Sequence, residues 1–541
     1  MFIVTLSIEI SMTETNEASS AQLKKSLTIA SLIMMGSVLL SRIMGMAREM
    51  VLAHLLGTNV EMDAYVAAFI VPEFLNHFLA GGFLSITFIP IFQKYLFAGQ
   101  REKSWKVFSN LITIGSVAFI VLIIVSTIFT DRIIGLLGHH ISEGPQRELT
   151  VRLTRIIMPA QLLFYWGAFL MAVQYANHKF FLPALAPLFY NLGIIVCGWA
   201  LYKYLGVAGF AWGVLAGAFV GNVLIQLPGA LRIGMRFRPV FSIADPDFKS
   251  YVVLTLPLVV GLGMTFSNEV FFRFFGSFLG TGGLASINYS LRTMLPLVGV
   301  FGQASGVASY PFLSRLAAEK KFGEMNQLLN GIVIKIAVYL IPICFIMMAL
   351  SENVIAVLFQ HGRFSHVSTL LASPVLVVYL IGAFPFAAST IVMRNYYAMQ
   401  NTLFPMVIST IIAALSIPCY WLLSKSFGAQ GIALTSSIAM FLQFTSLYII
   451  WSVKRDNMPD FLKTSALVAK IVLISALGWI LCHEIAVNMH GRFAGKDRFI
   501  DNLMIAGVAG LPSIVAVFLV LEALKISNTR VIILRLLKKS H

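Results

Sequence analysis

Fourteen long apolar runs dominate the sequence and leave few folds open to it. A run of about 20 apolar residues crosses the hydrocarbon core of a bilayer as a helix. The runs lie at about 27–47, 63–95, 107–129, 153–175, 183–203, 208–228, 251–279, 284–312, 330–350, 369–398, 405–424, 431–452, 464–485 and 502–524. Only 11% of the residues are charged, whereas soluble domains carry about 25%. We therefore predict an all-α polytopic membrane protein with fourteen transmembrane helices.

The basic residues outside these runs are distributed unevenly. An even number of spans puts both chain ends on one side, where the loops carry 22 Lys and Arg against 9 in the opposite loops. The positive-inside rule then predicts that both termini are cytoplasmic. Residues 1–24 lack the charged start and cleavage site of a signal peptide, so we expect a cytoplasmic N-terminal segment. The net charge of +16 indicates membrane lipids rather than nucleic acid as the polyanionic partner.

The sequence repeats itself at an offset of 222 residues. Residues 175–211 match 397–433 without a gap, with eleven of 37 positions identical, among them Pro183, Cys197 and Trp199. A repeat unit of six helices gives both copies the same orientation, related by an axis along the membrane normal. We therefore expect two parallel six-helix lobes, an architecture typical of alternating-access transporters. The predicted organisation is an N-lobe at 25–228, a cytoplasmic linker at 229–249, a C-lobe at 250–453, an extra helix pair at 464–524 and a basic cytoplasmic tail at 525–541.

Motifs for covalent or cofactor chemistry are missing from the sequence. The segment from Gly491 to Asp497 lacks the spacing and the final Ser or Thr of a phosphate-binding P-loop. There is no His-Glu-x-x-His, no paired-Cys metal spacing and no Gly-x-Ser-x-Gly. The four cysteines lie in apolar runs, where a small buried hydrophobe is the expected role. We predict no catalytic residue, no metal and no cofactor: a transporter rather than an enzyme.

A few ionisable residues lie inside the runs, where their cost makes them candidates for function. Arg42 and Arg48 lie on the first span, Asp63 opens the second and Arg292 lies within the eighth. Arginine pairs bidentately with phosphate and keeps its charge, so this set predicts a cationic cavity for an anionic headgroup. Under the alternative, Arg48, Glu49 and Asp63 lie at the interface and snorkel or pair with one another. A further pair, Glu269 and Arg273, is four residues apart on the seventh span; this spacing favours mutual neutralisation, with a cavity role as the alternative.

Several motifs together resemble one family. They are Ser41-Arg42-x-x-Gly45-x-x-Arg48, Gly57-x5-Asp63-Ala64-x4-Phe69, Phe83-x4-Phe88-x-Pro90, Ala186-Pro187-x3-Asn191, Leu358-Phe359-Gln360-His361-Gly362-Arg363-Phe364 and Tyr397-Ala398-x-Gln400-x4-Pro405. They resemble the MurJ (MviN) lipid II flippases of the multidrug/oligosaccharidyl-lipid/polysaccharide exporter superfamily, across nearly the whole chain. The resemblance implies fourteen helices, with a lipid-tail groove formed by the last two. It also implies a substrate-binding cavity that includes Arg42, Arg48, Asp63 and Arg292.

The chain departs from the family pattern in its second and eighth spans. Where the family reads Pro-Asn-x-x-Arg-Arg-x-x-Ala-Glu-Gly, this chain has Asn76, His77 and Gly81 in place of both arginines and the glutamate. The family aspartate before Arg292 is Leu291. A second group of expected cavity-lining residues comprises Glu73, Asn76, His77, Glu269 and Arg273.

The resemblance implies a flippase that moves lipid II, an undecaprenyl-pyrophosphate-linked peptidoglycan precursor, from the inner to the outer leaflet of the bacterial inner membrane. A coupling cation and the membrane potential are both candidates for its energy source. The missing second-span arginines keep open a flippase for another polyprenyl-linked glycan, such as an exopolysaccharide or O-antigen unit. A non-transporting scaffold for cell-wall enzymes is the third hypothesis.

Overall fold

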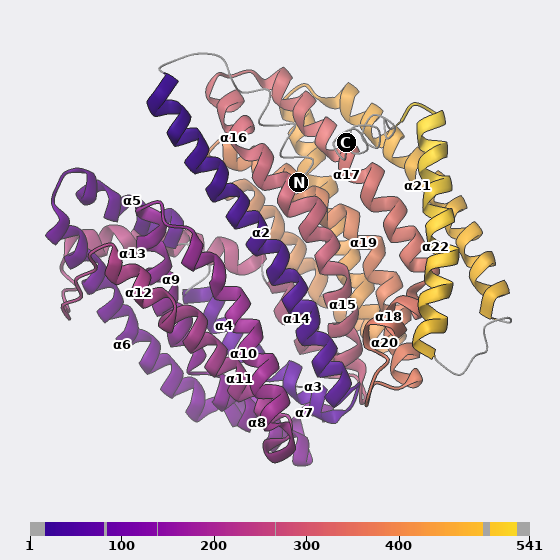
Figure 1. The fold of residues 1–541 in the computed structure, drawn as a ribbon, viewed down its shortest axis with the longest axis horizontal. Helices are drawn as coiled ribbons and strands as arrows, with labels where there is room; N and C mark the ends of the chain where they lie inside the picture. The colour runs from indigo at the N-terminus through magenta and orange to yellow at the C-terminus, as the bar shows by residue number, and fades with distance from the viewer. Residues whose placement is uncertain (1–16, 80–83, 138, 266, 491–497, 527–541) are drawn as a thin grey trace. The chain divides into compact units, whose positions relative to one another are not determined.

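The structure is a computed structural model that describes all residues except 1–16, 80–83, 138, 266, 491–497 and 527–541. The described residues form α-helices, two short π-helices and the turns between them, with no strand among them. The chain packs as two compact units, Thr13–Ala285 and Ser286–His541. The prediction of an all-helical membrane protein is confirmed at this level (Figure 1).

The first unit contains the helices up to the beginning of α15. They are α2 (Glu17–Leu56), α3 (Val60–Ala67), α4 (Ile70–Leu79), α5 (Leu84–Phe97), α6 (Arg101–Ile134), α7 (His139–Ser142), α8 (Gly144–Ile157), α9 (Ala160–Ala176), α10 (Phe181–Leu205), α11 (Ala208–Phe219), η1 (Val220–Leu224), α12 (Gln226–Arg232), α13 (Pro246–Thr265) and α14 (Ser267–Gly276).

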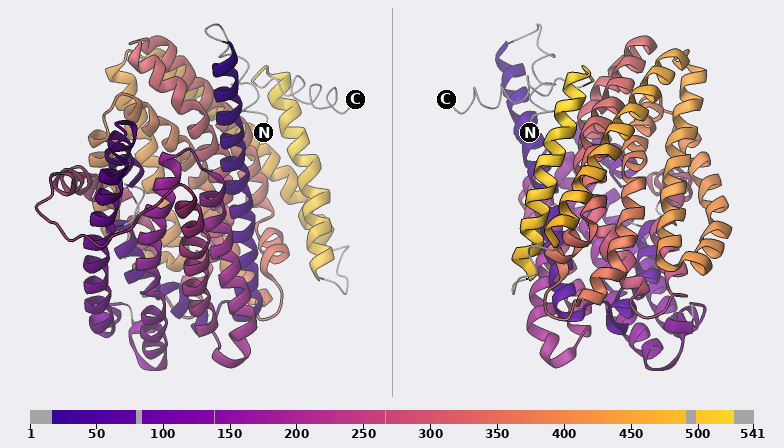
Figure 2. Two further views of the ribbon diagram at one scale, coloured as in Figure 1. Left: turned by 60° about the vertical axis from the view of Figure 1, so that its left-hand side comes forward. Right: turned by 90° about the vertical axis from the view of Figure 1, so that its right-hand side faces the viewer.

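The second unit contains the rest of the chain. Its helices are α15 (Gly283–Val298, which starts in the first unit), η2 (Gly299–Gln303), α16 (Ala304–Ala318), α17 (Phe322–Ala349), α18 (Ser351–Phe359), α19 (His366–Ala398), α20 (Leu403–Lys454), α21 (Met458–His490) and α22 (Arg498–Ala523). Within this unit α21 and α22 pack against α17 (Figure 2), burying Ala337, Ile341, Ile471, Val517 and Leu521 together.

Nine helices in the described part of the chain are long and apolar enough to cross a membrane. Their outer faces carry large apolar side chains; on α6, for example, Ile124 and Ile128 remain 53% and 65% exposed. Apolar surface of this extent is stable against lipid rather than water.

Five of the predicted runs fold as interrupted helices. The run at 153–175 is divided between α8 and α9, and the run at 208–228 is divided among α11, η1 and α12. The run at 63–95 becomes α3, α4 and α5, and the run at 251–279 becomes α13 and α14. The run at 284–312 becomes α15 and α16, joined by η2, which begins three residues after Pro296. A proline lacks the N–H that would close the helical hydrogen bond, so it favours such local rearrangement. The opposite case is α20, which contains two predicted runs on either side of Gly428, a residue with non-helical backbone angles.

The repeat in the sequence is also a repeat in local backbone structure. At the 222-residue offset the same helix boundaries recur: helices end at Ala176 and Ala398, begin at Phe181 and Leu403, and end at Arg232 and Lys454. Residues with positive φ recur at the same offset: His178 and Gln400, Gly206 and Gly428, and Gly234 and Asp456. Two copies of one structural plan therefore underlie these segments.

Packing groups the helices differently from the repeat. The repeat places α13 and α14 with the second copy, yet both pack against α4, and α13 also packs against α5 and α6. The Tyr95 hydroxyl, at the end of α5, donates to Asp247 on α13 at 2.9 Å. The boundary between the compact units therefore falls at 285–286 rather than in the linker at 229–249. The two six-helix lobes stay a prediction.

Candidate substrate-binding site

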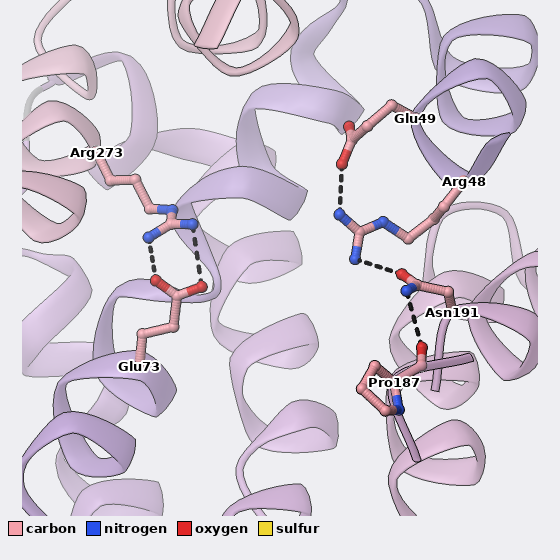
Figure 3. Close-up of polar contacts among 6 residues, drawn as sticks. All are labelled: Arg48, Glu49, Glu73, Pro187, Asn191 and Arg273. Atoms are coloured by element: carbon pink, nitrogen blue, oxygen red, sulfur yellow. Dashed lines mark hydrogen bonds and ion pairs between the residues drawn. The ribbon is translucent and has the colours of Figure 1, made fainter. Parts of the chain in front are cut away.

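Arg48 near the end of α2 is held between an acid and an amide. Its Nη2 donates to Glu49 Oε1 at 2.6 Å, and its Nη1 donates to Asn191 Oδ1 on α10 at 3.2 Å (Figure 3). Asn191 in turn donates through Nδ2 to the Pro187 carbonyl at 2.9 Å, which orients its Oδ1 toward the arginine. The Arg48 side chain is 17% exposed and that of Glu49 only 3%. The ion pair expected under the alternative hypothesis is therefore present for Arg48 and Glu49.

The Arg48 cluster keeps one donor unused. Its Nε is buried and has no hydrogen-bond partner among the described residues. A buried guanidinium requires a counter-charge, which Glu49 supplies, and it still has the capacity to bind a further acceptor. The arrangement suits recognition of an oxygen-rich anion.

Arg273 on α14 forms the second buried cluster. Its Nη2 donates to Glu73 Oε1 at 3.0 Å and its Nη1 contacts Glu73 Oε2, so the two side chains pair fork to fork (Figure 3). Glu269, the partner that the four-residue spacing suggests, is the weaker one: its Oε2 lies 4.0 Å from Nη1, although its carbonyl accepts from Nη1 at 3.3 Å. The main neutralising partner of Arg273 is thus on α4, 200 residues earlier in the chain.

Asp63 lies in the first turn of α3 and binds the start of α15. Its Oδ2 accepts from the Gly282 N–H and its Oδ1 from the Ala285 N–H, both at 2.7 Å, and the residue is fully buried. These groups belong to the first turn of α15, where a carboxylate satisfies free N–H groups and interacts favourably with the helix dipole. Asp63 therefore holds the start of α15 against α3, and its contact with substrate stays a prediction.

The other predicted residues of the first unit lie on two helices. Arg42 is half-buried on α2, six residues before Arg48. Asn76 is half-buried on α4, one turn after Glu73. The backbone of His77 continues α4, but its side chain lies outside the described residues.

Two arginines of the second unit lie within its helices. Arg292 is half-buried on α15, and its Nε is buried without a hydrogen-bond partner in the described residues. Arg394 on α19 lies over the Tyr310 ring of α16, with 5.8 Å between the guanidinium carbon and the ring centroid. Whether Arg42 and Arg292 face one another stays a prediction.

Sequence reasoning missed the partners rather than the charged residues. Asn191 belongs to a motif quoted for the family resemblance, yet nothing in its spacing indicates a bond to Arg48. Glu73 and Arg273 are both among the expected cavity-lining residues, and their opposite charges inside apolar runs are the sequence signal for a pair between two spans. In the described part of the chain no group of three or more His, Cys, Asp or Glu residues is placed to hold a metal ion.

The chain is similar to known proteins over most of its length. A relative from Vibrio cholerae serotype O1, named "Probable lipid II flippase MurJ", is 26% identical over 510 residues, covering 90% of this chain and 97% of that protein. A relative of the same name from Thermotoga maritima is 28% identical over 409 residues, covering 75% of this chain and 82% of that protein.

Solved structures share the fold. The structure titled "Lipid II flippase MurJ, inward closed conformation" matches with a TM-score of 0.74 and 24% identity, covering 91% of this chain and 99% of that one. An inward-facing multidrug resistance MATE family transporter of the MOP superfamily matches with a TM-score of 0.62 and 14% identity, covering 81% of this chain and 99% of that one.

The family model described as "Lipid II flippase MurJ" matches residues 52–495. This range includes Asp63, the Glu73–Arg273 pair, Asn191 and Arg292. The predicted family is therefore confirmed, and the chain belongs to the lipid II flippase MurJ family.

Proposed function

We propose that this protein is a flippase that moves lipid II from the inner to the outer leaflet of the bacterial cytoplasmic membrane by alternating access. Family membership and the names of the relatives support lipid II as the substrate. The single structural observation that carries the proposal is that Arg48 and Arg292 lie on helices of a molecule with an apolar surface, each with a buried Nε that has no hydrogen-bond partner among the described residues. Taking a diphosphate out of water is unfavourable unless such groups pair with it.

The proposed mechanism assigns roles to the charged residues. Arg42, Arg48 and Arg292 bind the pyrophosphate through their planar forks, which match the geometry of phosphate oxygens. Asp63 holds the start of α15, the helix that carries Arg292. Asn76, His77 and Glu269 line the same cavity. Translocation needs no covalent step, so we propose a transporter without enzymatic activity, metal or cofactor.

The proposed architecture keeps fourteen spans and cytoplasmic termini. Lobes 25–228 and 250–453 rock against one another and expose the cavity to each side in turn. The helix pair at 464–524 provides a groove for the lipid tail; in the structure these helices, α21 and α22, pack against α17. A coupling cation and the membrane potential are both candidates for the energy source.

One observation favours a second candidate, a flippase for another polyprenyl-linked glycan. Asn76, His77 and Gly81 stand where the family pattern has two arginines and a glutamate. These positions alter the polar pattern of the cavity, whereas the pyrophosphate-polyprenyl part is common to both substrates. A scaffold for cell-wall enzymes has no specific observation in its favour.

The test is rescue of a bacterium depleted of its own lipid II flippase. We expect the wild-type chain to restore growth and to restore the appearance of lipid II in the outer leaflet, measured by accessibility to an external probe. Normal membrane levels without rescue would contradict the lipid II proposal. In that event, rescue of a strain that lacks an exopolysaccharide or O-antigen flippase would support the second candidate.

A further inference from the structure

The side chains of Glu73 and Arg273 are buried to different extents, which an ion pair that only links two helices does not require. The arginine side chain is only 3% exposed, whereas those of Glu73 and Glu269 are 21% and 37% exposed. The cation is therefore enclosed, whereas the two acids are more accessible. The guanidinium carbon of Arg273 also lies over the ring of its neighbour Phe272, 4.8 Å from the ring centroid.

The carboxylate of Glu73 fills only part of the donor capacity of Arg273. Glu73 takes the end-on fork formed by Nη1 and Nη2, while Nε is buried with no hydrogen-bond partner among the described residues. A guanidinium carries five N–H donors. A phosphate group can take the same fork as a carboxylate, and the second phosphate of a pyrophosphate offers a further acceptor for the unused Nε.

Breaking a buried ion pair is costly because it leaves a charge uncompensated. Exchanging one anion for another keeps the enclosed arginine neutralised, and the charge that is displaced is that of Glu73, the more exposed partner of the pair. Glu73 and Arg273 belong to short helices, α4 and α14, of ten residues each. The α4 helix begins after the turn at Ala68 and Phe69. Replacement of Glu73 at Arg273 by an incoming anion breaks contacts of these side chains, so it does not require either helix to unfold.

We propose that Glu73 is a built-in counter-anion, which occupies the fork of Arg273 when the site is empty and is displaced by a phosphate of the prenyl-pyrophosphate substrate. This inference rests on the proposed function and adds Arg273 to the residues that bind the substrate. Displacement removes this ion pair, so binding of the anion releases one polar link between α4 and α14.

The test measures binding of farnesyl pyrophosphate, a short prenyl pyrophosphate, to the purified full-length protein by calorimetry. Glu73→Gln removes the competing charge and keeps the side-chain shape, so we expect it to tighten binding about tenfold. Arg273→Gln removes the binding fork, and we expect affinity to fall about 30-fold or more. Farnesol, which lacks the pyrophosphate, should bind all variants alike.

A matched control is available in the same unit. Arg147 on α8 and Asp131 on α6 form another two-pronged ion pair, with Nε–Oδ1 at 2.9 Å and Nη2–Oδ2 at 2.8 Å, but their side chains are 39% and 53% exposed. Asp131→Asn should leave farnesyl pyrophosphate binding unchanged. An equal gain in Asp131→Asn and Glu73→Gln would show a general charge effect and overturn the proposal.

Thermal unfolding separates the counter-anion from a purely structural pair. Glu73→Gln should melt earlier than wild type because Arg273 is left buried without its counter-charge. Farnesyl pyrophosphate should then raise its melting temperature more than that of wild type, since stabilisation follows affinity. If Glu73→Gln binds no more tightly than wild type and gains no extra stabilisation, the pair is structural only and the proposal is wrong.

Growth rescue distinguishes this inference from the proposed function. The double variant Glu73→Gln with Arg273→Gln keeps a neutral amide pair between α4 and α14 but lacks the cation, so we expect it to fail. Full rescue by this variant would overturn the role of Arg273 and leave the flippase proposal standing. Failure of the wild-type chain to rescue, with pyrophosphate binding intact, would instead overturn lipid II transport.

Discussion

At the scale of the residue, Arg42 and Arg292 provide a test of the cationic cavity. If they bind pyrophosphate through a bidentate fork, Arg→Lys should impair growth rescue about as strongly as Arg→Ala, because an ammonium cannot form the fork. Removing one partner of a desolvated charge pair costs about 2–5 kcal/mol. Substrate affinity should therefore fall by roughly 30- to 4,000-fold.

The control for this prediction is Lys470, an exposed residue on α21. Lys470→Ala should rescue growth like wild type at the same membrane level. Full rescue by Arg42→Ala and Arg292→Ala at normal levels would contradict the cationic cavity and favour the scaffold hypothesis.

Asp63 is expected to affect stability through its two buried bonds to the start of α15. Asp63→Ala leaves two backbone N–H groups buried without an acceptor, so we expect a loss of about 2 kcal/mol or more. Asp63→Asn keeps one acceptor oxygen, so its free energy of unfolding should fall between those of wild type and Asp63→Ala.

The control is Asn59→Ala, which removes one neutral cap bond from α3 and should cost about 1 kcal/mol. Thermal unfolding in detergent measures all three; equal melting of Asp63→Ala and wild type would refute the assigned role.

The Arg273 cluster shows what sequence spacing could and could not indicate about a residue's partner. Glu269 and Arg273 are four apart, so helix geometry alone brings them near one another. The closer partner is Glu73, because the packing of α4 against α14 decides which carboxylate reaches the guanidinium. The candidate residues could be selected from the sequence, but their pairing could not.

At the scale of the element, the contact between α10 and α11 depends on glycine. A Cβ on Gly217 would lie 2.4 Å from the Tyr190 carbonyl oxygen, and one on Gly193 would lie 2.4 Å from the Gly217 Cα. Small residues of this kind let membrane helices approach closely. Gly217→Ala should separate the helices and cost about 1–3 kcal/mol.

The matched control is Gly331→Ala in α17, where an added Cβ meets nothing within 4 Å. There alanine should be neutral or gain about 0.5–1 kcal/mol, because it favours the helix. Melting temperatures and membrane levels of the two variants provide the comparison. Equal stability of both variants would show that the α10–α11 contact can relax.

At the scale of the whole molecule, the asymmetry of basic residues predicts cytoplasmic termini. A reporter that is active only in the cytoplasm should be active when it is fused after His541. A reporter that is active only in the periplasm should be inactive at the same position. The pair of reporters provides its own control. Periplasmic activity would contradict the even number of spans.

Three properties of this protein are already present in the linear sequence: lipid as the surrounding solvent, the all-helical class and the repeated plan. Apolar runs of span length with few charged residues exclude a soluble fold. In lipid, hydrogen bonds within each helix satisfy the backbone, so the spans are helical. The 222-residue repeat appears again as matching helix ends and as left-handed residues such as Gly206 and Gly428. These properties follow from local composition and local backbone preference, so a linear sequence contains them.

Which charged groups meet depends on how the helices pack in three dimensions. Asp63 binds the first turn of α15 across 219 and 222 residues of chain, and Glu73 reaches Arg273 across 200. Packing likewise joined α13 and α14 to the first unit, although the repeat assigns them to the second copy. The physical reason is that a buried charge must be neutralised by whichever group the packed helices place within a few ångströms. That choice depends on distances between helices, which the order of residues along the chain does not contain.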